Sequence, residues 1–199
     1  MYIIGRIILG LVGLVVLIII IVKIFGGSPP KKTPPSTTPK NQVLSLPDYA
    51  TTDATVSLTT DGIVNGDDIH RAIRIIVSNS TRELDIYQGY SGHVLSFQTF
   101  GNSFEAYSVF LKALNNSGFT LKTSATKSPN DDRGQCPTGY RYILDLNKDN
   151  TDLSRTWSST CGTGTAGGDL GTIIQLFQDQ ITGYGTLTEN VDLNATASQ

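Results

Sequence analysis

The apolar residues form one uninterrupted run near the start of the chain and patterned runs farther on. Residues 7–22, IILGLVGLVVLIIIIV, contain no charged side chain and have a basic residue on each side. Because a helix rises about 1.5 Å per residue, the stretch from Tyr2 to Phe25 can cross a hydrocarbon layer about 30 Å thick. A cleaved signal peptide is the alternative, but it would have a shorter apolar core and a small residue, not Phe25, before its cleavage site. The pattern predicts an uncleaved transmembrane anchor over residues 1–27, with residues 2–25 in contact with the lipid bilayer.

A segment rich in proline and threonine separates this run from the rest of the chain. Residues 28–40, SPPKKTPPSTTPK, have no apolar side chain to bury apart from proline. Proline lacks a backbone donor and favours the extended polyproline II conformation. We therefore expect residues 28–53 to be a semi-rigid linker.

Alternation of apolar and polar positions between residues 54 and 101 is typical of β-strands. Turn-rich segments at 78–80 and 90–92 separate the runs, and Asn65-Gly66 adds a hairpin-turn signal. The apolar positions are Ile73, Ile75 and Val77, then Leu84 and Ile86, then Leu95 and Phe97. We expect an antiparallel meander of three or four strands.

Two later segments have the helical period of 3.6 residues. The first follows a capping residue, Asn102, with Glu105 three residues on, and Gly118 marks its end. The second follows the capping residue Asp169 and ends by Gly183. The apolar stripes are Phe104, Tyr107, Phe110, Leu111 and Leu114 in the first helix, and Leu170, Ile173, Ile174, Phe177 and Ile181 in the second.

The only two cysteines bracket residues 136–161, CPTGYRYILDLNKDNTDLSRTWSSTC. The segment alternates like a β-hairpin, and a turn centred between Lys148 and Asp149 aligns Cys136 with Cys161 on one face. The same register pairs Tyr140 with Trp157, Tyr142 with Arg155, Leu144 with Leu153, and Leu146 with Thr151. We predict a disulfide between the two cysteines, worth about 3.5 kcal/mol in the chain-entropy treatment. Two free thiols are the alternative.

The order of elements is strands, helix, a short strand at 119–125, hairpin and helix, which favours an α+β fold. We expect an antiparallel sheet, made of the meander and the C-terminal disulfide-closed hairpin, with two helices packed on one face and a single transmembrane helix before it. The folded domain is predicted over residues 54–187 and a polar, disordered tail over residues 188–199.

Charge limits the classes of function and the location. Only two of the 17 acidic side chains precede residue 54, whereas five of the 15 basic ones do. The folded domain is therefore acidic, which excludes a nucleic-acid binder because phosphate contacts need an excess of cationic side chains. Lysines after the anchor favour a cytoplasmic C-terminal side, but long domains translocate largely regardless of charge. Since disulfides persist outside the cytosol, we expect a single-pass plasma-membrane protein with its C-terminal domain outside the cytoplasm.

A weak calcium signature lies in the predicted hairpin turn, DLNKDNTD. The candidate ligands are Asp145, Asn147, Asp149 and Asp152. Asn150 and Thr156 stand where a calcium loop has its glycine and its bidentate glutamate, so a solvated turn is the competing interpretation.

The segment GTGTAG, residues 162–167, formally matches a dinucleotide-binding fingerprint. No parallel strand can follow it, and Asp169 places negative charge where a phosphate would bind. We interpret it as a flexible turn, and the sequence predicts no cofactor.

Histidines and aromatic residues supply the remaining candidates. His70 or His93 could serve a hydrolase, although no recognised nucleophile motif accompanies either one. The aromatic set is Tyr87, Tyr90, Tyr140, Tyr142 and Trp157. Of these, Tyr140, Tyr142 and Trp157 form a candidate contact surface for a protein or glycan, with half-buried sheet packing as the alternative.

The segments QGYSGHV, AYSVFLKALNNSGF, CPTGYRYILDL and WSSTCGTGTAGGDLGTIIQLFQDQI resemble uncharacterised single-pass membrane proteins of Saccharibacteria-like candidate-phylum bacteria. The resemblance covers residues 60–184. It implies a cell-surface location and no activity, and it carries over no site residue.

These observations favour a non-enzymatic cell-envelope protein that binds a protein or glycan or serves envelope assembly. An envelope hydrolase using His70 or His93 is one alternative. A pilin-like filament subunit is another, although the sequence has no recognisable prepilin cleavage site and the proline-rich segment would break a continuous spine helix.

Overall fold

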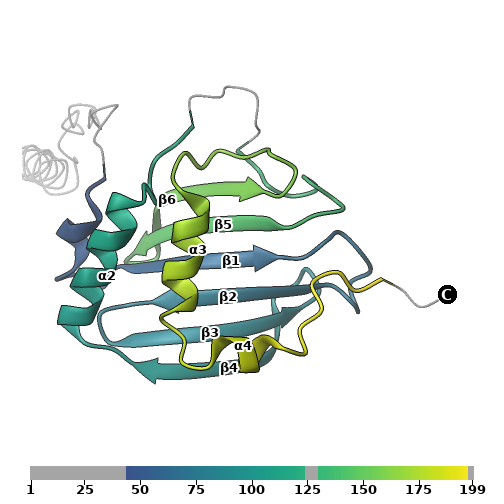
Figure 1. Ribbon diagram of the computed structural model, residues 1–199, viewed down its shortest axis with the longest axis horizontal. Helices are drawn as coiled ribbons and strands as arrows, with labels where there is room; N and C mark the ends of the chain where they lie inside the picture. The colour runs from purple at the N-terminus through teal and green to yellow at the C-terminus, as the bar shows by residue number, and fades with distance from the viewer. Residues whose placement is uncertain (1–43, 124–129, 197–199) are drawn as a thin grey trace, which may run out of the picture. The chain divides into compact units, whose positions relative to one another are not determined.

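The computed structural model describes residues 44–123 and 130–196, all within one compact unit, Val43–Gln199 (Figure 1). In this part of the chain no helix is both long and apolar enough to cross a bilayer. The predicted anchor over residues 1–27 lies outside the described residues.

The described chain forms six strands, three α-helices and a short 3-10 helix. In chain order they are η1 (Leu46–Tyr49), β1 (Thr55–Asp61), β2 (Arg71–Val77), β3 (Thr81–Gln88), β4 (His93–Gly101), α2 (Phe104–Asn116), β5 (Arg141–Lys148), β6 (Thr151–Ser159), α3 (Leu170–Gln178) and α4 (Tyr184–Thr188). The strands make one sheet in the order β4-β3-β2-β1-β5-β6, with every neighbouring pair antiparallel. The predicted α+β fold is confirmed to this extent: a meander of four strands and a C-terminal hairpin form one antiparallel sheet.

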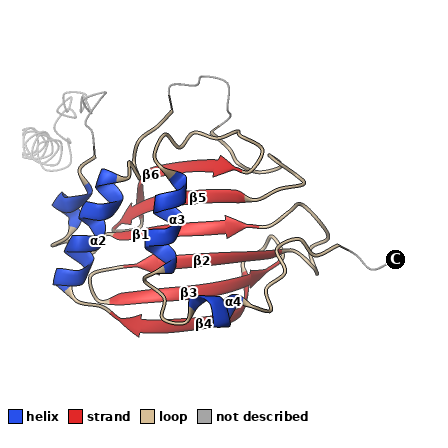
Figure 2. Cartoon of the chain, in the orientation of Figure 1, coloured by secondary structure: helices blue, strands red, loops and turns tan. Residues whose placement is uncertain are grey.

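Helices α2 and α3 cover one face of this sheet, which we call the covered face (Figure 2). Side chains alternate along each strand, so every second residue of the central strands points at the helices. The core on this face contains Val56, Leu58, Ile73, Ile75, Leu84, Leu144 and Leu146 from the sheet and Tyr107, Phe110, Leu111, Leu114, Ile173 and Phe177 from the helices. Phe110 meets Phe177 edge to face with ring centroids 5.2 Å apart, which joins the two helices above the sheet.

Both helix starts and the end of α2 lie close to the predicted positions, whereas α3 ends at Gln178, before the predicted end at Gly183, and Gly183 precedes the separate helix α4. The Ser103 side chain caps α2 by accepting from the Ala106 N–H, while Asn102 donates to the Ser78 carbonyl instead of capping. Gly118 follows the end of α2 with a φ of +77°, a left-handed conformation that glycine adopts without strain. Asp169 caps α3 as predicted, accepting from the Thr172 N–H at 3.2 Å.

The hairpin exists, but its predicted register is wrong. Ile143 pairs with Trp157 and Lys148 with Thr151, so the two-residue turn is Asp149-Asn150 and not Lys148-Asp149. Both turn residues are left-handed, with φ of +50° and +60°, as in a type I′ turn. Asp and Asn tolerate this conformation far better than Lys, which moves the turn one residue along the chain. An irregularity between Leu146 and Asn147 shifts the pairing by one more residue over the part of the hairpin that lies farther from the turn.

Three other boundaries differ from expectation. Strands β1 and β2 are joined by a loop over residues 62–70 rather than by a tight Asn65-Gly66 turn. The predicted strand at 119–125 contributes an isolated bridge, Lys122 with Ala166, and residues 124–129 lie outside the described part. The folded unit starts before residue 54, because Leu46 of η1 is fully buried.

The end of the described chain is docked rather than frayed. Val191 and Leu193 pack against the core, and the Leu193 carbonyl accepts from the Ile63 N–H at 3.0 Å. The Asn65 side chain donates to the Ala195 carbonyl at 2.7 Å. Residues 188–196 therefore differ from the predicted disordered tail because the loop between β1 and β2 binds their backbone.

Candidate functional site

The sheet face opposite α2 and α3, which we call the open face, carries most of the charged strand residues. None of the described helices lies on it (Figure 2). Strand alternation places there Ser57, Thr59, Asp61, Arg74, Ile76, Glu83, Asp85, Tyr87, Phe97, Arg141, Ile143, Asp145, Arg155 and Trp157. These residues were not predicted as one site, although the sequence carries a signal for this face: a charge between two buried apolar residues, as in Ile73-Arg74-Ile75.

A hollow of about 780 Å³ opens on this face over β1, β2, β5 and β6. Thr59, Arg74 and Ile143 line it from the strands, and the exposed hairpin turn Asp149-Asn150 lines it from one side. The lining contains five aspartates against two arginines and one lysine, so the hollow is acidic overall. Its mixture of carboxylates, guanidinium groups and amides offers many donors and acceptors to a polar ligand.

Arg155 joins two parts of the molecule at this hollow. Its guanidinium donates to Asp145 of β5 at 2.9 Å and to Asp132, in the loop before the disulfide, at 3.0 Å. Both aspartates are buried, whereas the Arg155 side chain is 46% exposed. Burial raises the pKa of Asp145 above its ordinary value, and the charge of Arg155 opposes that rise. Burial alone would favour the neutral form of Asp145, and the charge of Arg155 therefore stabilises its carboxylate form at the hollow.

Arg74 lies next to a second group of carboxylates, on β3. Its guanidinium donates to the Ser57 hydroxyl at 3.2 Å, and its buried Nε has no hydrogen-bond partner within the described residues. Burial and the neighbouring Asp85 raise the pKa of Glu83. The Tyr87 hydroxyl donates to Asp85 at 2.8 Å. Burial raises the pKa of this hydroxyl, and the hydrogen bond to Asp85 raises it further.

His70 is buried in a separate cluster at the end of β1. Its Nε2 lies 2.7 Å from an Asp61 oxygen and its Nδ1 lies 3.0 Å from the Ile63 carbonyl. Arg141 donates to the other Asp61 oxygen, and the Tyr90 ring stacks on the imidazole at 4.1 Å between centroids. Both ring nitrogens of His70 therefore lie within hydrogen-bond distance of oxygen atoms of the same chain. In this arrangement both nitrogens are engaged within the fold and neither faces a nucleophile.

His93 lies elsewhere, exposed in β4 and opposite Gln88 of β3. The hydrolase hypothesis uses either histidine by itself, so the placement of the two does not test it.

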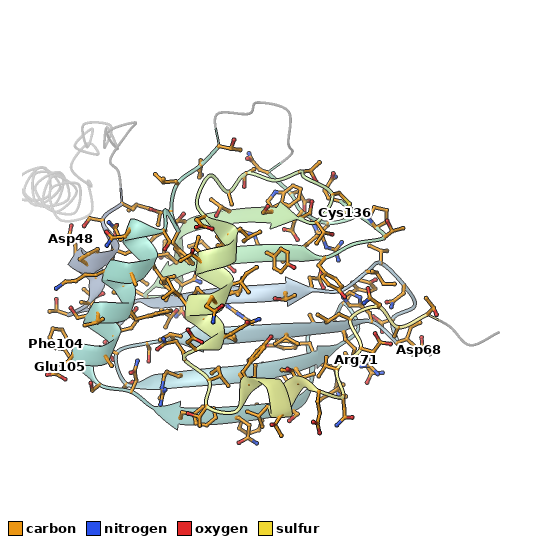
Figure 3. The ribbon with its side chains drawn as sticks, viewed as in Figure 1. Asp48, Asp68, Arg71, Phe104, Glu105 and Cys136 are labelled. Atoms are coloured by element: carbon orange, nitrogen blue, oxygen red, sulfur yellow. A yellow bond between two sulfur atoms is a disulfide. The ribbon has the colours of Figure 1, made fainter. Side chains whose placement is uncertain are left out.

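The predicted disulfide is present. Cys136 and Cys161 are bonded, with their Cα atoms 5.6 Å apart, beyond the ends of β5 and β6. Cys136 lies at the end of the sheet opposite to Phe104, which begins α2 (Figure 3). The pairing was predicted correctly although the predicted register is wrong. The two cysteines lie in turns outside the strands, so the bridge does not require them to be direct strand partners.

The three aromatic residues of the predicted contact surface do not lie together. Trp157 is fully buried on the open-face side of β6, whereas Tyr142 packs against the core of the covered face. The register shift is odd, which moves these two side chains to opposite faces. The Tyr140 hydroxyl accepts from the Asn194 amide near the docked chain end.

The predicted calcium ligands are spread around the hairpin turn. Asp145 pairs with Arg155, while Asp149 and Asp152 are exposed. Across residues 44–123 and 130–196, no group of three His, Cys, Asp or Glu side chains is placed to hold a metal ion. Asp145, Asn147, Asp149 and Asp152 nevertheless all line the hollow, so they belong to the candidate site by position.

The glycine-rich segment after β6 packs on that strand. The N–H groups of Thr165 and Ala166 both donate to the Trp157 carbonyl, at 2.7 and 2.9 Å, and Gly164 forms a bridge with Ser158. A Cβ on Gly164 would lie 2.4 Å from the Trp157 carbonyl oxygen. Glycine is therefore needed there for close backbone approach.

Comparison with known proteins leaves the chain without an assigned family, since no family model and no curated protein matches it.

Proposed function

We propose that this chain is a membrane-anchored, extracytoplasmic binding domain of the cell envelope, without enzymatic activity, that holds a protein or glycan on the open face. The observation that carries the proposal is the hollow of about 780 Å³ on that face. Sugar hydroxyls and polar peptide groups both donate and accept hydrogen bonds, which suits a lining of alternating carboxylates and guanidinium groups.

Two further features support this proposal. The disulfide fits an oxidising compartment outside the cytoplasm, where such bonds persist. The engagement of both His70 nitrogens disfavours the hydrolase alternative, because a general base needs a ring nitrogen within reach of the proton that it removes.

The location can be tested by counting thiols in full-length protein taken directly from cells. We expect no maleimide-reactive thiol under denaturing conditions without reductant, and two after reduction. Two reactive thiols before reduction would contradict an extracytoplasmic address.

Binding can be tested by capturing solubilised envelope components on the full-length chain. Asp53 and Asp152 are exposed and line the hollow, so Asp53→Lys with Asp152→Lys should abolish capture of the specific component. The matched control is Asp179→Lys, which reverses an exposed charge at the C-terminal end of α3, away from the hollow. Equal capture by the double variant, or no capture by the unaltered chain, would rule out the hollow as the site.

The same preparations test the enzymatic alternative. Turnover of peptidoglycan or envelope peptides that is lost in His70→Ala or His93→Ala would overturn the non-enzymatic part of the proposal.

A further inference from the structure

The two outer strands of the sheet differ in how their free edges are treated. The outer edge of β6 is covered by residues 164–166 of the same chain, which form a bridge and donate two hydrogen bonds to it. Within residues 44–123 and 130–196, β4 pairs only with β3. All of its residues except Phe100 are exposed. An edge strand of this kind presents a row of backbone donors and acceptors to another strand.

Strand β4 also lacks the usual devices that protect an edge. Its sequence, HVLSFQTFG, contains no proline, lysine, arginine, aspartate or glutamate. Its exposed side chains include Phe97 at 64%, Leu95 at 45% and Val94 at 43%. The register irregularity lies at the start of the strand, so residues Ser96–Gly101 pair regularly with β3. Natural sheets place charges, proline or a covering segment where pairing must be avoided.

We propose that β4 pairs antiparallel with β4 of a second copy of this chain, about a two-fold axis beside Phe97. Phe97 is the middle residue of the nine-residue strand, so this axis brings it next to its counterpart and pairs Ser96 with Gln98. The two six-stranded sheets then continue into each other, with one open face running across both copies.

Three observations favour a second copy over another partner. A charge on the two-fold axis would meet its own counterpart, and charges close to the axis would lie near theirs, but β4 has no Lys, Arg, Asp or Glu to repel a second copy. The facing Phe97 rings form an aromatic cross-strand pair, which stabilises antiparallel ribbons. The β6 edge is occupied by the chain itself, so pairing through β4 closes at a dimer instead of extending into a filament.

The proline-rich residues 28–40 of the same chain are a poor alternative occupant, because proline cannot donate to a ladder. Pairing through one ribbon is a small interface, and we expect a dissociation constant on the order of 10 µM in solution. Tethering both copies to one membrane would raise their effective concentration above that value.

The test uses charge reversal at the two-fold axis in the full-length chain, followed by sedimentation velocity in mild detergent. Phe97→Lys and Phe97→Asp should each weaken association by about tenfold or more, because like charges would face each other. An equimolar mixture of the two variants should restore association, since Lys then faces Asp. Val109→Asp is the matched control, because Val109 on α2 is 66% exposed and should leave association unchanged.

Recovery in the mixture separates pairing through β4 from association through the anchor or through another face. A chain that stays monomeric up to millimolar concentration overturns the proposal. So do equal association by all variants and loss of association in Val109→Asp. Thermal melting checks that each variant is folded. If either Phe97 variant is not, Gln98→Lys and Gln98→Glu replace the pair, because the axis makes the two exposed Gln98 side chains diagonal neighbours across the strands.

Discussion

Ile75 and Ile76 are neighbours in β2, yet they belong to faces of the sheet with opposite composition. Ile75 is 2% exposed in the core beneath the helices, while Ile76 is half-buried and lines the hollow. Around Ile75 the neighbours are almost all apolar; around Ile76 they are arginines, carboxylates and hydroxyls. The covered face therefore fixes the fold, whereas the open face can carry charges that the fold does not require. Such a division places the proposed binding site where substitutions cost the least stability.

The largest expected effect comes from truncating each isoleucine in turn. Ile75→Ala removes packed methyl and methylene groups from the core and should lower the free energy of unfolding by about 3 kcal/mol. Ile76→Ala removes the same atoms from a half-solvated site and should cost about 1 kcal/mol or less. Urea unfolding of the two variants measures the difference. Equal losses would mean that the open face is as tightly packed as the covered one.

An intermediate effect is expected from the ion pairs of the open face. Arg155→Met leaves two buried aspartates without their shared partner and should cost about 1 kcal/mol at pH 7, less than for a fully buried pair because Arg155 is half exposed. Arg133→Met breaks an arginine–aspartate pair that is exposed on both sides and should leave stability unchanged. Denaturant titrations of both variants provide the comparison.

The Arg155 effect should also depend on pH. The pKa of Asp145 is already raised by burial, and loss of Arg155 raises it further. A carboxyl with a raised folded-state pKa contributes no penalty below its unfolded value, and stability is lost as pH rises through the folded value. The deficit of Arg155→Met should therefore shrink as the pH falls through the raised folded-state pKa of Asp145 toward its ordinary value of 3.8, and a deficit that grows in acid would contradict the assignment.

The smallest expected effect is a gain. Burial and Asp85 raise the pKa of Glu83, so ionised Glu83 opposes folding at neutral pH. Because solvent screens this partly exposed carboxylate, Glu83→Gln should raise stability by only about a few tenths of a kcal/mol at pH 7. The gain should vanish near pH 3, where the carboxyl is protonated in both states.

Asp169 at the start of α3 is a control for Glu83, because its pKa is shifted in the opposite direction. The Thr172 hydroxyl and N–H lower its pKa, so its contribution is present at neutral pH and lost as the pH falls through its folded value. Asp169→Asn should lower thermal stability at pH 7 and have less effect in acid. The same sign for the Glu83 and Asp169 variants would show that these carboxyl environments are wrongly assigned.

The covered face could be predicted from the sequence because its signals are local. The stripes of α2 and α3, the cap at Asp169 and the alternation of Ile73, Ile75 and Val77 each depend on a few neighbouring residues. The cysteine pair was also found correctly. Each of these features follows from the period of a single helix or strand, or from the spacing of a few residues along the sequence.

The open face could not be predicted because it depends on how distant strands align. The left-handed Asp149-Asn150 turn moved the hairpin by an even step, and the irregularity beside Leu146 then added one residue, so that Trp157 and Tyr142 came to lie on opposite faces. The ion pairs of Arg155 with Asp132 and Asp145 join a loop to two strands, and the spacing of these three residues along the sequence does not indicate that they meet. The exposed apolar edge of β4 was read as ordinary strand alternation, since its neighbours in the sheet were unknown.

The disulfide encloses the whole ribbon of β5 and β6, including the exposed tip at Asp149-Asn150. A protease that cuts the backbone at that tip would leave both fragments joined through the sulfur atoms, with β5 still hydrogen-bonded to β1. The nicked molecule would keep its mass on a gel until a reductant is added. A domain that faces secreted proteases would in this way stay covalently whole after cleavage at this exposed tip.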